Sequence, residues 1–440
     1  MIDVLPGFID VLPGFREFYP PDCFIRNFIF EKMRQMCQNF GFSEYDSPIL
    51  EPLELFTEKS GEEIAAQLFN FIDRGGRSVA LRPEMTPAVA RMIGSKINTL
   101  KRPLKWFSIE ENFRYERPQK GRLRSFYQLN IDIFDEQNIS ADAEIIALAV
   151  AILQSLGLSA NDFHVRLSDR QLWTILLQSL GVPENFITET LSIIDKIERE
   201  SHDIIVEKLN ALNLDGIKIL ENIKTFQSIR NLDILKTFLQ ATVQQPDLKN
   251  DVDIRLEQLK SLLKHLDDFG LTSFITLDFS IVRGLAYYTG FVFEFFERSG
   301  KSRALTGGGR YDDLIEKFGY PKTAAIGLAI GDVTLTNILQ EKNLLPSFEQ
   351  KCDLFMIYDK FSKPFALNDM HQLRLAGFSV TYALKENASP EKQFKQALQQ
   401  SHWVATYREA KDKIILRNID YRKDYEIQRQ EIIHFLQQQR

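Results

Sequence analysis

The chain has 440 residues, of which 44% are hydrophobic and 26% charged, and its formal net charge is −6. These values are those of an ordinary globular protein, and the length predicts two or three domains. No apolar run is long enough to span a bilayer, and the start lacks the basic and apolar regions of a secretory signal. The three cysteines form no CxxC pair, which argues against a zinc site or a disulfide framework. We therefore expect a cytoplasmic protein with no membrane partner.

The sequence IDVLPGF occurs at residues 2–8 and again, unchanged, at residues 9–15. A tandem repeat this short cannot be a solenoid unit. We interpret it as a local duplication or a cloning remnant, and we expect the first copy to be poorly ordered. Residues 1–15 are therefore assigned to an N-terminal extension.

A helix and an extended segment are the next elements in the chain. Apolar residues recur at helical spacing from about Asp22 to Phe40, which predicts a helix. Residues 42–56 follow as an extended segment, because Pro48 and Pro52 rule out a helix there.

Two strands joined by a Gly75-Gly76 turn come next, and the second runs into a helix near residues 87–93.

The stretch FRYERPQKGRLRSFYQ at residues 113–128 then places four arginines and a lysine among aromatic residues. Arginine forks suit phosphate oxygens, and aromatic faces allow bases to stack. The β-prone flanks predict two strands joined by a charged loop. We favour a focused anion site over the alternative, a solvated charged hairpin.

The rest of the chain changes character twice. Residues 172–266 are rich in Leu, Ile, Lys, Glu and Gln at helical period, which predicts a helical insertion. Strand patterns return at residues 274–297 and again around a turn at Gly307, Gly308 and Gly309. The C-terminal residues alternate strand and helix patterns, as in a small α/β domain. Parallel βαβ repeats with a GxGxxG turn are absent from the sequence, which disfavours a Rossmann fold.

The predicted fold class is therefore α+β, with an antiparallel sheet core, a helical insertion and a C-terminal α/β domain. The core comprises residues 16–165 and 270–345, and the insertion comprises residues 166–269. Residues 350–440 form the C-terminal domain.

Four motifs resemble those of the histidyl-tRNA synthetases, a family of class II aminoacyl-tRNA synthetases. Residues 113–128 resemble the second class II signature motif, and IVRGLAYYTGFVFE at residues 281–294 resembles the family's histidine-binding motif, usually RGLDYY. LTGGGRYDDL at residues 305–314 is similar to the companion glycine-rich motif, and LRPEMTP at residues 81–87 to the LRPE-x-T segment. The resemblance extends from about Pro13 to the C-terminus. RGLAYYTG and GLAIGD are most similar to the subgroup of plant organelles and some bacteria.

Two positions depart from the family pattern. Thr334, in GLAIGDVTL, stands where the third motif usually has an arginine that contacts the γ-phosphate of ATP. Ala286 replaces the aspartate of RGLDYY. The subgroup shares both features, so we expect activity to be retained.

The resemblance implies a two-step reaction that uses L-histidine, ATP with Mg²⁺, and tRNA(His). The histidine carboxylate attacks the α-phosphorus of ATP, and the histidyl group then passes to the 3′ end of the tRNA. Such chemistry depends on positioning and fixed cations more than on a nucleophile. Arg114 and Arg283 are the implied catalytic pair, one on each side of the α-phosphate. Glu116 would accept a hydrogen bond from adenine, Arg122 would reach the outer phosphates, and no protein ligand to a metal is predicted.

The implied histidine site must hold an ammonium, a carboxylate and an imidazole. Glu84, with Thr86 beside it, suits the ammonium, although a surface ion pair is an alternative role for Glu84. Gln128 would orient the carboxylate. Asp132 shares the strand face of Gln128 by the two-residue period, and it takes the place of a glutamate that faces the imidazole in the family.

Aromatic residues and glycines complete the implied site. Tyr288 would hydrogen-bond the other imidazole nitrogen, and Tyr287 would pack beside it, although such a pair is also typical of a core. Gly307, Gly308 and Gly309 would let the backbone approach the substrate, or would simply form a tight turn.

The resemblance also implies partners. Pro48 and the helix before it would form a homodimer interface, although the apolar helix could equally be a buried core element. The C-terminal domain would bind the anticodon, with Lys392 and Lys395 on phosphates or on a solvated face. Three further basic residues of the hairpin either contact the tRNA acceptor end or are simply exposed to solvent: Arg117, Lys120 and Arg124.

Two other functions stay open at this point. The first is a non-catalytic regulatory subunit of ATP phosphoribosyltransferase, because such proteins share the core fold and an LRP-acidic-M-T segment. They typically lack the C-terminal domain and the intact hairpin, which are both present here. The second is an RNA-binding or signalling paralogue without catalysis.

Overall fold

The computed structural model describes residues 9–57, 66–119, 121–197, 200–282, 287–300, 304–384, 389–408 and 412–439. The chain divides into two compact units, Met1–Pro346 and Ser347–Arg440. Both units mix helices with sheets, so the predicted α+β class is confirmed. No helix in the described ranges is long and apolar enough to cross a membrane.

An eight-stranded sheet forms the centre of the first unit, in the order β1-β5-β6-β11-β10-β9-β7-β8. Its strands are β1 (Ser43–Glu44), β5 (Leu104–Phe113), β6 (Ser125–Phe134), β7 (Phe163–Asp169), β8 (Ile275–Leu277), β9 (Phe291–Glu297), β10 (Thr306–Arg310) and β11 (Ala325–Gly331). The inner pairs are antiparallel, as predicted, while the edge pairs β1–β5 and β7–β8 are parallel.

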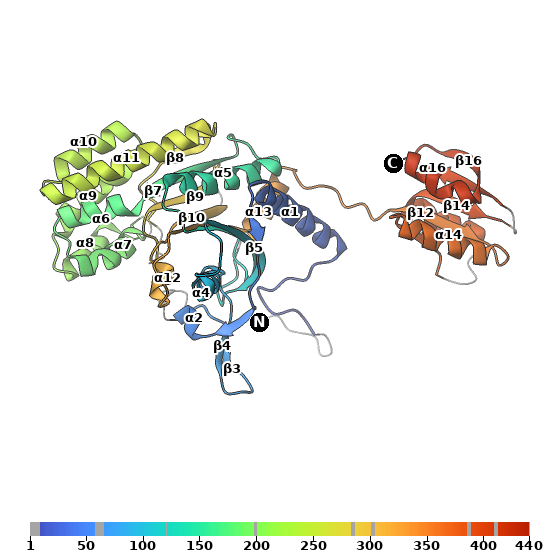
Figure 1. Ribbon diagram of the computed structural model, residues 1–440, viewed down its shortest axis with the longest axis horizontal. Coiled ribbons are helices and arrows are strands. Elements are labelled where there is room, and N and C mark those ends of the chain that lie inside the picture. Colours follow the sequence, from blue (N-terminus) through green and yellow to red (C-terminus); the bar gives the residue numbers. More distant parts are fainter. Residues whose placement is uncertain are drawn as a thin grey trace. The chain divides into compact units, whose positions relative to one another are not determined.

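Helices cover both faces of this sheet (Figure 1). On one face lie α1 (Pro20–Asn39), α5 (Ile139–Ser155) and α13 (Asp332–Glu341), which share the largest hydrophobic core. On the other face lie α4 (Thr86–Lys96) and α12 (Leu314–Lys317), which pack in a second core. A three-stranded sheet in the order β2-β4-β3 precedes α4 and comprises β2 (Leu50–Pro52), β3 (Asn70–Ile72) and β4 (Ser78–Leu81).

The predicted helical insertion is a lobe beside the β7–β8 edge of the sheet (Figure 1). Its α-helices are α6 (Arg170–Ser179), α7 (Ile187–Ile194), α8 (His202–Ala211), α9 (Gly216–Ser228), α10 (Leu232–Thr242) and α11 (Pro246–Asp268). Short 3₁₀ turns are η1 (Glu184–Phe186) and η2 (Thr272–Phe274). Helix α11 packs on α5 and α6, which ties the lobe to the core.

The second unit has its own five-stranded sheet in the order β13-β12-β14-β15-β16. Its elements are β12 (Cys352–Tyr358), α14 (Lys363–Leu375), β13 (Val380–Tyr382), α15 (Pro390–Gln400), β14 (Ser401–Tyr407), β15 (Lys413–Asn418), β16 (Lys423–Gln428), η3 (Arg429–Glu431) and α16 (Ile432–Gln438). Strand β12 pairs in parallel with both neighbours, and the remaining pairs are antiparallel. This is the small α/β domain predicted from the alternating patterns.

Three local predictions differ from the structure. Gly307, Gly308 and Gly309 lie inside β10 rather than in a turn, and they pair with β9 and β11. Strand β11 approaches Gly308 closely and β9 approaches Gly309 closely, which favours glycine at these two positions. The end of the predicted extended segment forms a short helix, α2 (Glu54–Thr57), where Leu55 and Phe56 are buried. Strand β7 was not predicted at all.

The second IDVLPGF copy packs against the β5–β6 hairpin, whereas the first, at residues 2–8, lies outside the described residues. The carbonyl of Gly14 accepts hydrogen bonds from the amides of Arg124 (2.8 Å) and Ser125 (3.2 Å). The ring of Phe15 lies 6.3 Å from that of Phe113. A Cβ atom on Gly14 would come within 2.9 Å of Arg124 Cγ, and the residue has a φ of +85°, so this close approach favours glycine.

Candidate active site

Strand β6 supplies the floor of the site. Gln128, Asn130 and Asp132 alternate along it, so their side chains share one face. Their partners on β11 are two glycines and an alanine, which leave space above that face: Gly331, Ala329 and Gly327. The sheet is therefore polar and open at this point.

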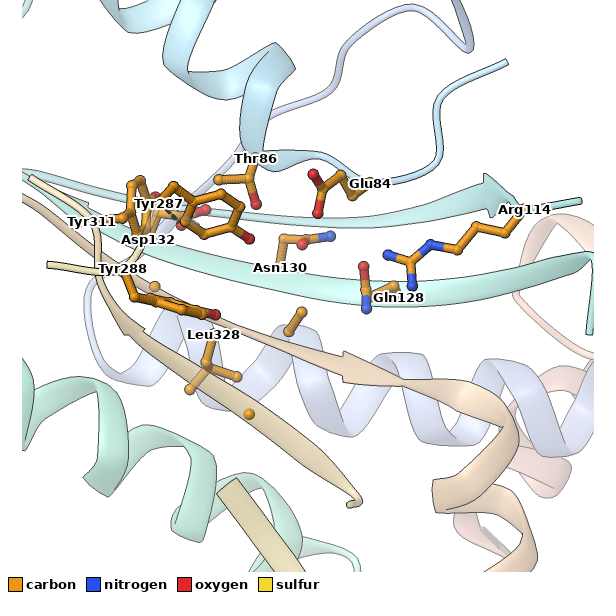
Figure 2. Close-up of a pocket in the computed structure, with 13 residues that line it drawn as sticks. Glu84, Thr86, Arg114, Gln128, Asn130, Asp132, Tyr287, Tyr288, Tyr311 and Leu328 are labelled. Atoms are coloured by element: carbon orange, nitrogen blue, oxygen red, sulfur yellow. Dashed lines mark hydrogen bonds between the residues drawn. The ribbon is translucent and has the colours of Figure 1, made fainter. Parts of the chain in front are cut away.

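A cavity of about 160 Å³, here called the inner pocket, opens over this floor (Figure 2). Eight of its lining residues were predicted from the sequence: Glu84, Thr86, Arg114, Gln128, Asp132, Tyr287, Tyr288 and Gly307. Five others were not: Asn130, Tyr311, Gly327, Leu328 and Ala329. The pocket thus gathers residues from all four motifs, and the roles assigned to them stay predictions.

Glu84 lies directly before α4 and faces one end of the inner pocket (Figure 2). It is only 5% exposed, and its Oε1 atom has no hydrogen-bond partner among the described residues. Burial raises the pKa of this carboxyl, and the nearby Arg114 opposes that shift. A buried acceptor without a partner is costly, so the site favours a ligand with a charged donor.

Arg114 follows the end of β5 and lines both this cavity and its neighbour. Its Nε atom donates a 3.0 Å hydrogen bond to the carbonyl of Pro83, and its guanidinium lies 5.3 Å from the ring centre of Phe126. Its two terminal nitrogens make no hydrogen bond with the described part of the chain. They are therefore available to an anion, as the sequence predicts.

Asp132 and Tyr311 form the other end of the inner pocket (Figure 2). The Tyr311 hydroxyl donates a 2.5 Å hydrogen bond to Asp132 Oδ1. Burial raises the pKa of Asp132 to about 7, against the effect of that bond. A Cβ atom on Gly327 would lie 2.0 Å from Asp132 Oδ1, so only glycine fits opposite this carboxylate. Two signals could have found the missed residues: Tyr311 directly follows the GGGR text, and Asn130 sits between Gln128 and Asp132 in the two-residue period.

Two buried tyrosines pack beside this end of the pocket. The ring centres of Tyr287 and Tyr288 are 5.0 Å apart, and those of Tyr287 and Tyr311 are 6.0 Å apart. Gly309 makes room for them, since its Cβ would lie 2.9 Å from Tyr288 Cδ1. Gly308 instead faces Gly327 and Leu328, and Gly307 is the member of the glycine run that lines both cavities.

A second cavity of about 310 Å³, here called the outer pocket, adjoins the inner one through Arg114 and Gln128. It is lined by Glu116, Arg122 and Thr334, and the nucleotide-binding role that the sequence assigns to this region stays a prediction. Arg122 Nη1 lies 2.9 Å from Glu116 Oε2, so the two form an ion pair across the hairpin loop. The predicted catalytic Arg283 lies outside the described residues, as does Ala286.

Asp332 closes the outer pocket at the start of α13. Its Oδ1 atom accepts a 3.0 Å hydrogen bond from the amide of Tyr127, and its Oδ2 atom lies 2.8 Å from Nη2 of Arg16. Burial raises the pKa of Asp332, and Arg16 opposes this. These contacts join the N-terminal segment, the hairpin and the helix that carries Thr334.

The described residues contain no group of three or more His, Cys, Asp or Glu side chains arranged to hold a metal ion. The outer pocket contains two carboxylates, Glu116 and Asp332, and both are already paired with arginines. The carboxylates of this pocket thus offer little to a protein-bound metal.

Residues 14–334 match the family model described as histidyl-tRNA synthetase. The histidine–tRNA ligase of Opitutus terrae is 45% identical over 433 residues, which is 97% of this chain and 96% of that protein. The chloroplastic/mitochondrial histidine–tRNA ligase of Arabidopsis thaliana is 40% identical over 77% of this chain and 67% of that protein. A crystal structure of histidyl-tRNA synthetase from Nostoc sp. PCC 7120 superposes with a TM-score of 0.78 at 22% identity, covering 98% of this chain and all of that one.

Proposed function

This chain belongs to the histidyl-tRNA synthetase family, and we propose that it is a histidine–tRNA ligase that binds histidine in the inner pocket and ATP in the outer pocket. The observation that carries the proposal is the pair of buried carboxylates at opposite ends of the inner pocket. Glu84 has an unpaired oxygen that suits an ammonium, and Asp132 is an acceptor that suits an imidazole N–H. The relation to a plant-organelle ligase agrees with the predicted subgroup.

In the first step, the histidine carboxylate attacks the α-phosphorus and pyrophosphate leaves. Arg114 lines both pockets, so it is placed to neutralise charge where the two substrates meet. Gln128, which also lines both, would orient the attacking carboxylate. Arg283 would act from the opposite side, as the family resemblance implies. The chain thereby supplies positioning and fixed charge, which this chemistry requires.

ATP would bring Mg²⁺ with it, and the ion would offset part of the negative charge of the phosphates. In the outer pocket Glu116 would accept a hydrogen bond from the adenine amino group, and Arg122 would bind the outer phosphates. Glu116 and Arg122 form an ion pair with each other in the structure, so nucleotide binding must replace this ion pair with contacts to the nucleotide. Thr334 cannot supply the charge of the usual third-motif arginine, which makes Arg122 the more important cation here.

In the second step, the histidyl group passes to the terminal ribose of tRNA(His). We assign the catalytic core to residues 16–165 and 270–345, the insertion to residues 166–269, and anticodon binding to residues 350–440. In the last of these, Lys392 and Lys395 lie exposed on α15 and would contact RNA phosphates.

We further propose a cytoplasmic homodimer. Helix α1, which the family resemblance assigns to the dimer interface, carries Phe24, whose side chain is 38% exposed, and Ile49 and Leu50, directly after Pro48, are 47% and 42% exposed. A second copy would cover them. The three cysteines are free, as expected in a reducing compartment.

The rival function, a regulatory subunit of ATP phosphoribosyltransferase, is less well supported, since curated relatives at 37–45% identity are named histidine–tRNA ligases. Incubation of the purified protein with ATP, Mg²⁺, labelled histidine and a tRNA(His) transcript tests the proposal. We expect acid-precipitable histidyl-tRNA, and none without ATP or with a transcript for another amino acid. No charging, together with activation of a short-form ATP phosphoribosyltransferase, would establish the rival instead.

A further inference from the structure

A third cavity, of about 520 Å³, lies where the β7–β8 edge of the sheet meets helix α9 of the insertion. We call it the edge cavity. Arg166 and Thr276 come from the sheet, Lys224 lies on α9, and Arg230 lies in the α9–α10 connection. Its lining includes three basic side chains and one carboxylate, that of Asp278, in a chain whose net charge is −6.

The edge cavity lies on the same sheet face as the inner pocket. Residues paired across neighbouring strands point to the same face. The register defines one row across six strands: Asn130, Ala329, Gly307, Glu294, Arg166 and Thr276. The first three residues of that row line the inner pocket, and the last two line the edge cavity. Four strand spacings separate Asn130 on β6 from Arg166 on β7, which is roughly 19 Å, and two spacings separate Gly307 on β10 from Arg166, which is roughly 10 Å.

The charges of the edge cavity do not balance. Arg230 Nη2 lies 3.0 Å from Asp278 Oδ1, and Arg166 Nε lies 3.6 Å from Asp278 Oδ2. One carboxylate therefore serves two guanidiniums. Lys224 is exposed, and its side chain forms no hydrogen bond or ion pair with the described residues. An ion-pair network that merely fastened the insertion to the sheet would not leave this surplus of positive charge.

Two buried donors in the cavity also have no acceptor among the described residues. Arg166 Nε donates to His164 Nε2 at 3.2 Å, and a neutral imidazole that accepts at Nε2 carries its proton on Nδ1. That Nδ1 is buried and has no hydrogen-bond partner among the described residues, and the same holds for the side-chain nitrogen Nε2 of Gln227. Burial lowers the pKa of His164, and the charges of Arg166 and Arg298 lower it further. The cavity is thus rich in donors and poor in acceptors, as an anion site is.

We propose that the edge cavity binds a backbone phosphate of the tRNA substrate while the 3′ end of that tRNA lies at the inner pocket. The proposal rests on the proposed function, because it is the ligase reaction that brings an RNA strand across this sheet face. Phosphate oxygens accept from guanidinium, ammonium, imidazole and amide donors alike, and the cavity offers all four. A site at this distance from the chemistry would hold the strand in register without touching the reacting atoms.

Lys224→Glu is the most direct test, because the side chain has no partner whose loss would disturb folding. Lys218→Glu, on the same helix but outside the cavity, is the matched control for charge. We expect Lys224→Glu to raise the KM for tRNA(His) about tenfold. The slope of log tRNA affinity against log salt concentration should also become shallower, by the amount expected for the loss of about one phosphate contact. Lys218→Glu should change neither. Arg230→Gln should act in the same direction as Lys224→Glu.

Histidine-dependent ATP–pyrophosphate exchange separates this proposal from the proposed function, because exchange does not involve tRNA. Normal exchange with weakened tRNA use in Lys224→Glu supports the edge cavity as an RNA site. An unchanged KM and salt dependence for tRNA would overturn it, as would an equal loss in Lys218→Glu. Added inorganic phosphate that alters exchange in the wild type but not in Lys224→Glu, with tRNA use unaffected, would assign the cavity to a free anion instead. Absence of exchange in the wild type would contradict the proposed function and with it the premise of this proposal, whereas normal exchange with unchanged tRNA use in Lys224→Glu would overturn the edge-cavity site alone.

Discussion

The hydroxyl of Tyr311 donates a hydrogen bond of 2.5 Å to Asp132, and Gly327 faces the same carboxylate oxygen from the neighbouring strand. The three residues come from β6, β11 and the segment after β10, so this end of the inner pocket is assembled from distant parts of the chain. Asp132 is one methylene shorter than the glutamate usual in the family. The bond from Tyr311 and the space left by Gly327 fix where that shorter carboxylate lies.

Gly327→Ala should weaken histidine binding. Its Cβ would overlap Asp132 Oδ1 at 2.0 Å, so the carboxylate must move away from Tyr311. We expect the KM for histidine in the exchange reaction to rise roughly tenfold or more, which corresponds to the loss of one charge-assisted hydrogen bond. Gly331→Ala, assayed at saturating ATP, is the control on the same strand, because Gly331 lines only the outer pocket and its Cβ meets nothing within 4 Å. If the two variants had the same KM for histidine, the positioning of Asp132 would not matter.

Asp132 should make the stability of the unliganded protein depend on pH. Burial raises its pKa from 3.8 to about 7, so the folded state holds a proton more tightly than the unfolded state. The resulting stabilisation is fully present below about pH 4 and is lost as the pH rises through 7. Asp132→Asn cannot ionise, so its melting temperature should exceed that of the wild type by an amount that grows from about pH 4 to pH 7 and then levels off. A difference that did not vary with pH would show that the carboxyl titrates normally.

Arg122→Ala should impair ATP binding strongly, because Thr334 supplies no compensating charge in the outer pocket. We expect the KM for ATP to rise by about tenfold or more while the KM for histidine changes little. Adding Thr334→Arg to this variant should recover part of the loss, since it returns a cation to the same cavity. Near-normal ATP use by Arg122→Ala would mean that another residue carries the role.

Removing one IDVLPGF copy should leave the melting temperature and the KM for ATP unchanged, whereas removing both copies should change them. A single copy is sufficient to provide the Gly14 carbonyl for the hairpin and to place Arg16 at Asp332. We expect the variant lacking residues 2–8 to match the full chain in melting temperature and in KM for ATP. The variant lacking residues 2–15 should lose the Gly14 contact, lower the melting temperature and raise that KM. Equal behaviour of the two variants would show that the packing of the second copy is incidental.

Local patterns predicted much of the fold. The β5–β6 hairpin, α1 and the insertion helices follow from apolar periodicity and from turn residues such as Gly41 and Gly76, both of which have positive φ angles. Strand β7 was missed because its short polar–apolar alternation precedes a strong helical pattern, and its main partner β9 lies more than a hundred residues further along the chain. Strand pairing of that kind is not encoded locally.

The candidate site was predictable where a motif carried it. Glu84, Arg114 and Gln128 were identified from their motifs, and the fold brings them together. Contacts between distant residues were not predictable, such as that of Arg16 with Asp332, which are 316 residues apart. The glycine run was placed in a turn because glycine marks turns in general, whereas close packing of three strands requires it here.

Histidine-dependent ATP–pyrophosphate exchange, compared between the wild type and Glu84→Gln, tests the central claim most directly. Glu84 is buried in the inner pocket with one oxygen unpaired, so its charge should be needed for the substrate ammonium. We predict exchange that requires histidine in the wild type, and a KM for histidine raised by at least about tenfold in Glu84→Gln. The account would be contradicted if the wild type showed no histidine-dependent exchange. It would also be contradicted if Glu84→Gln had the same KM for histidine as an active wild type.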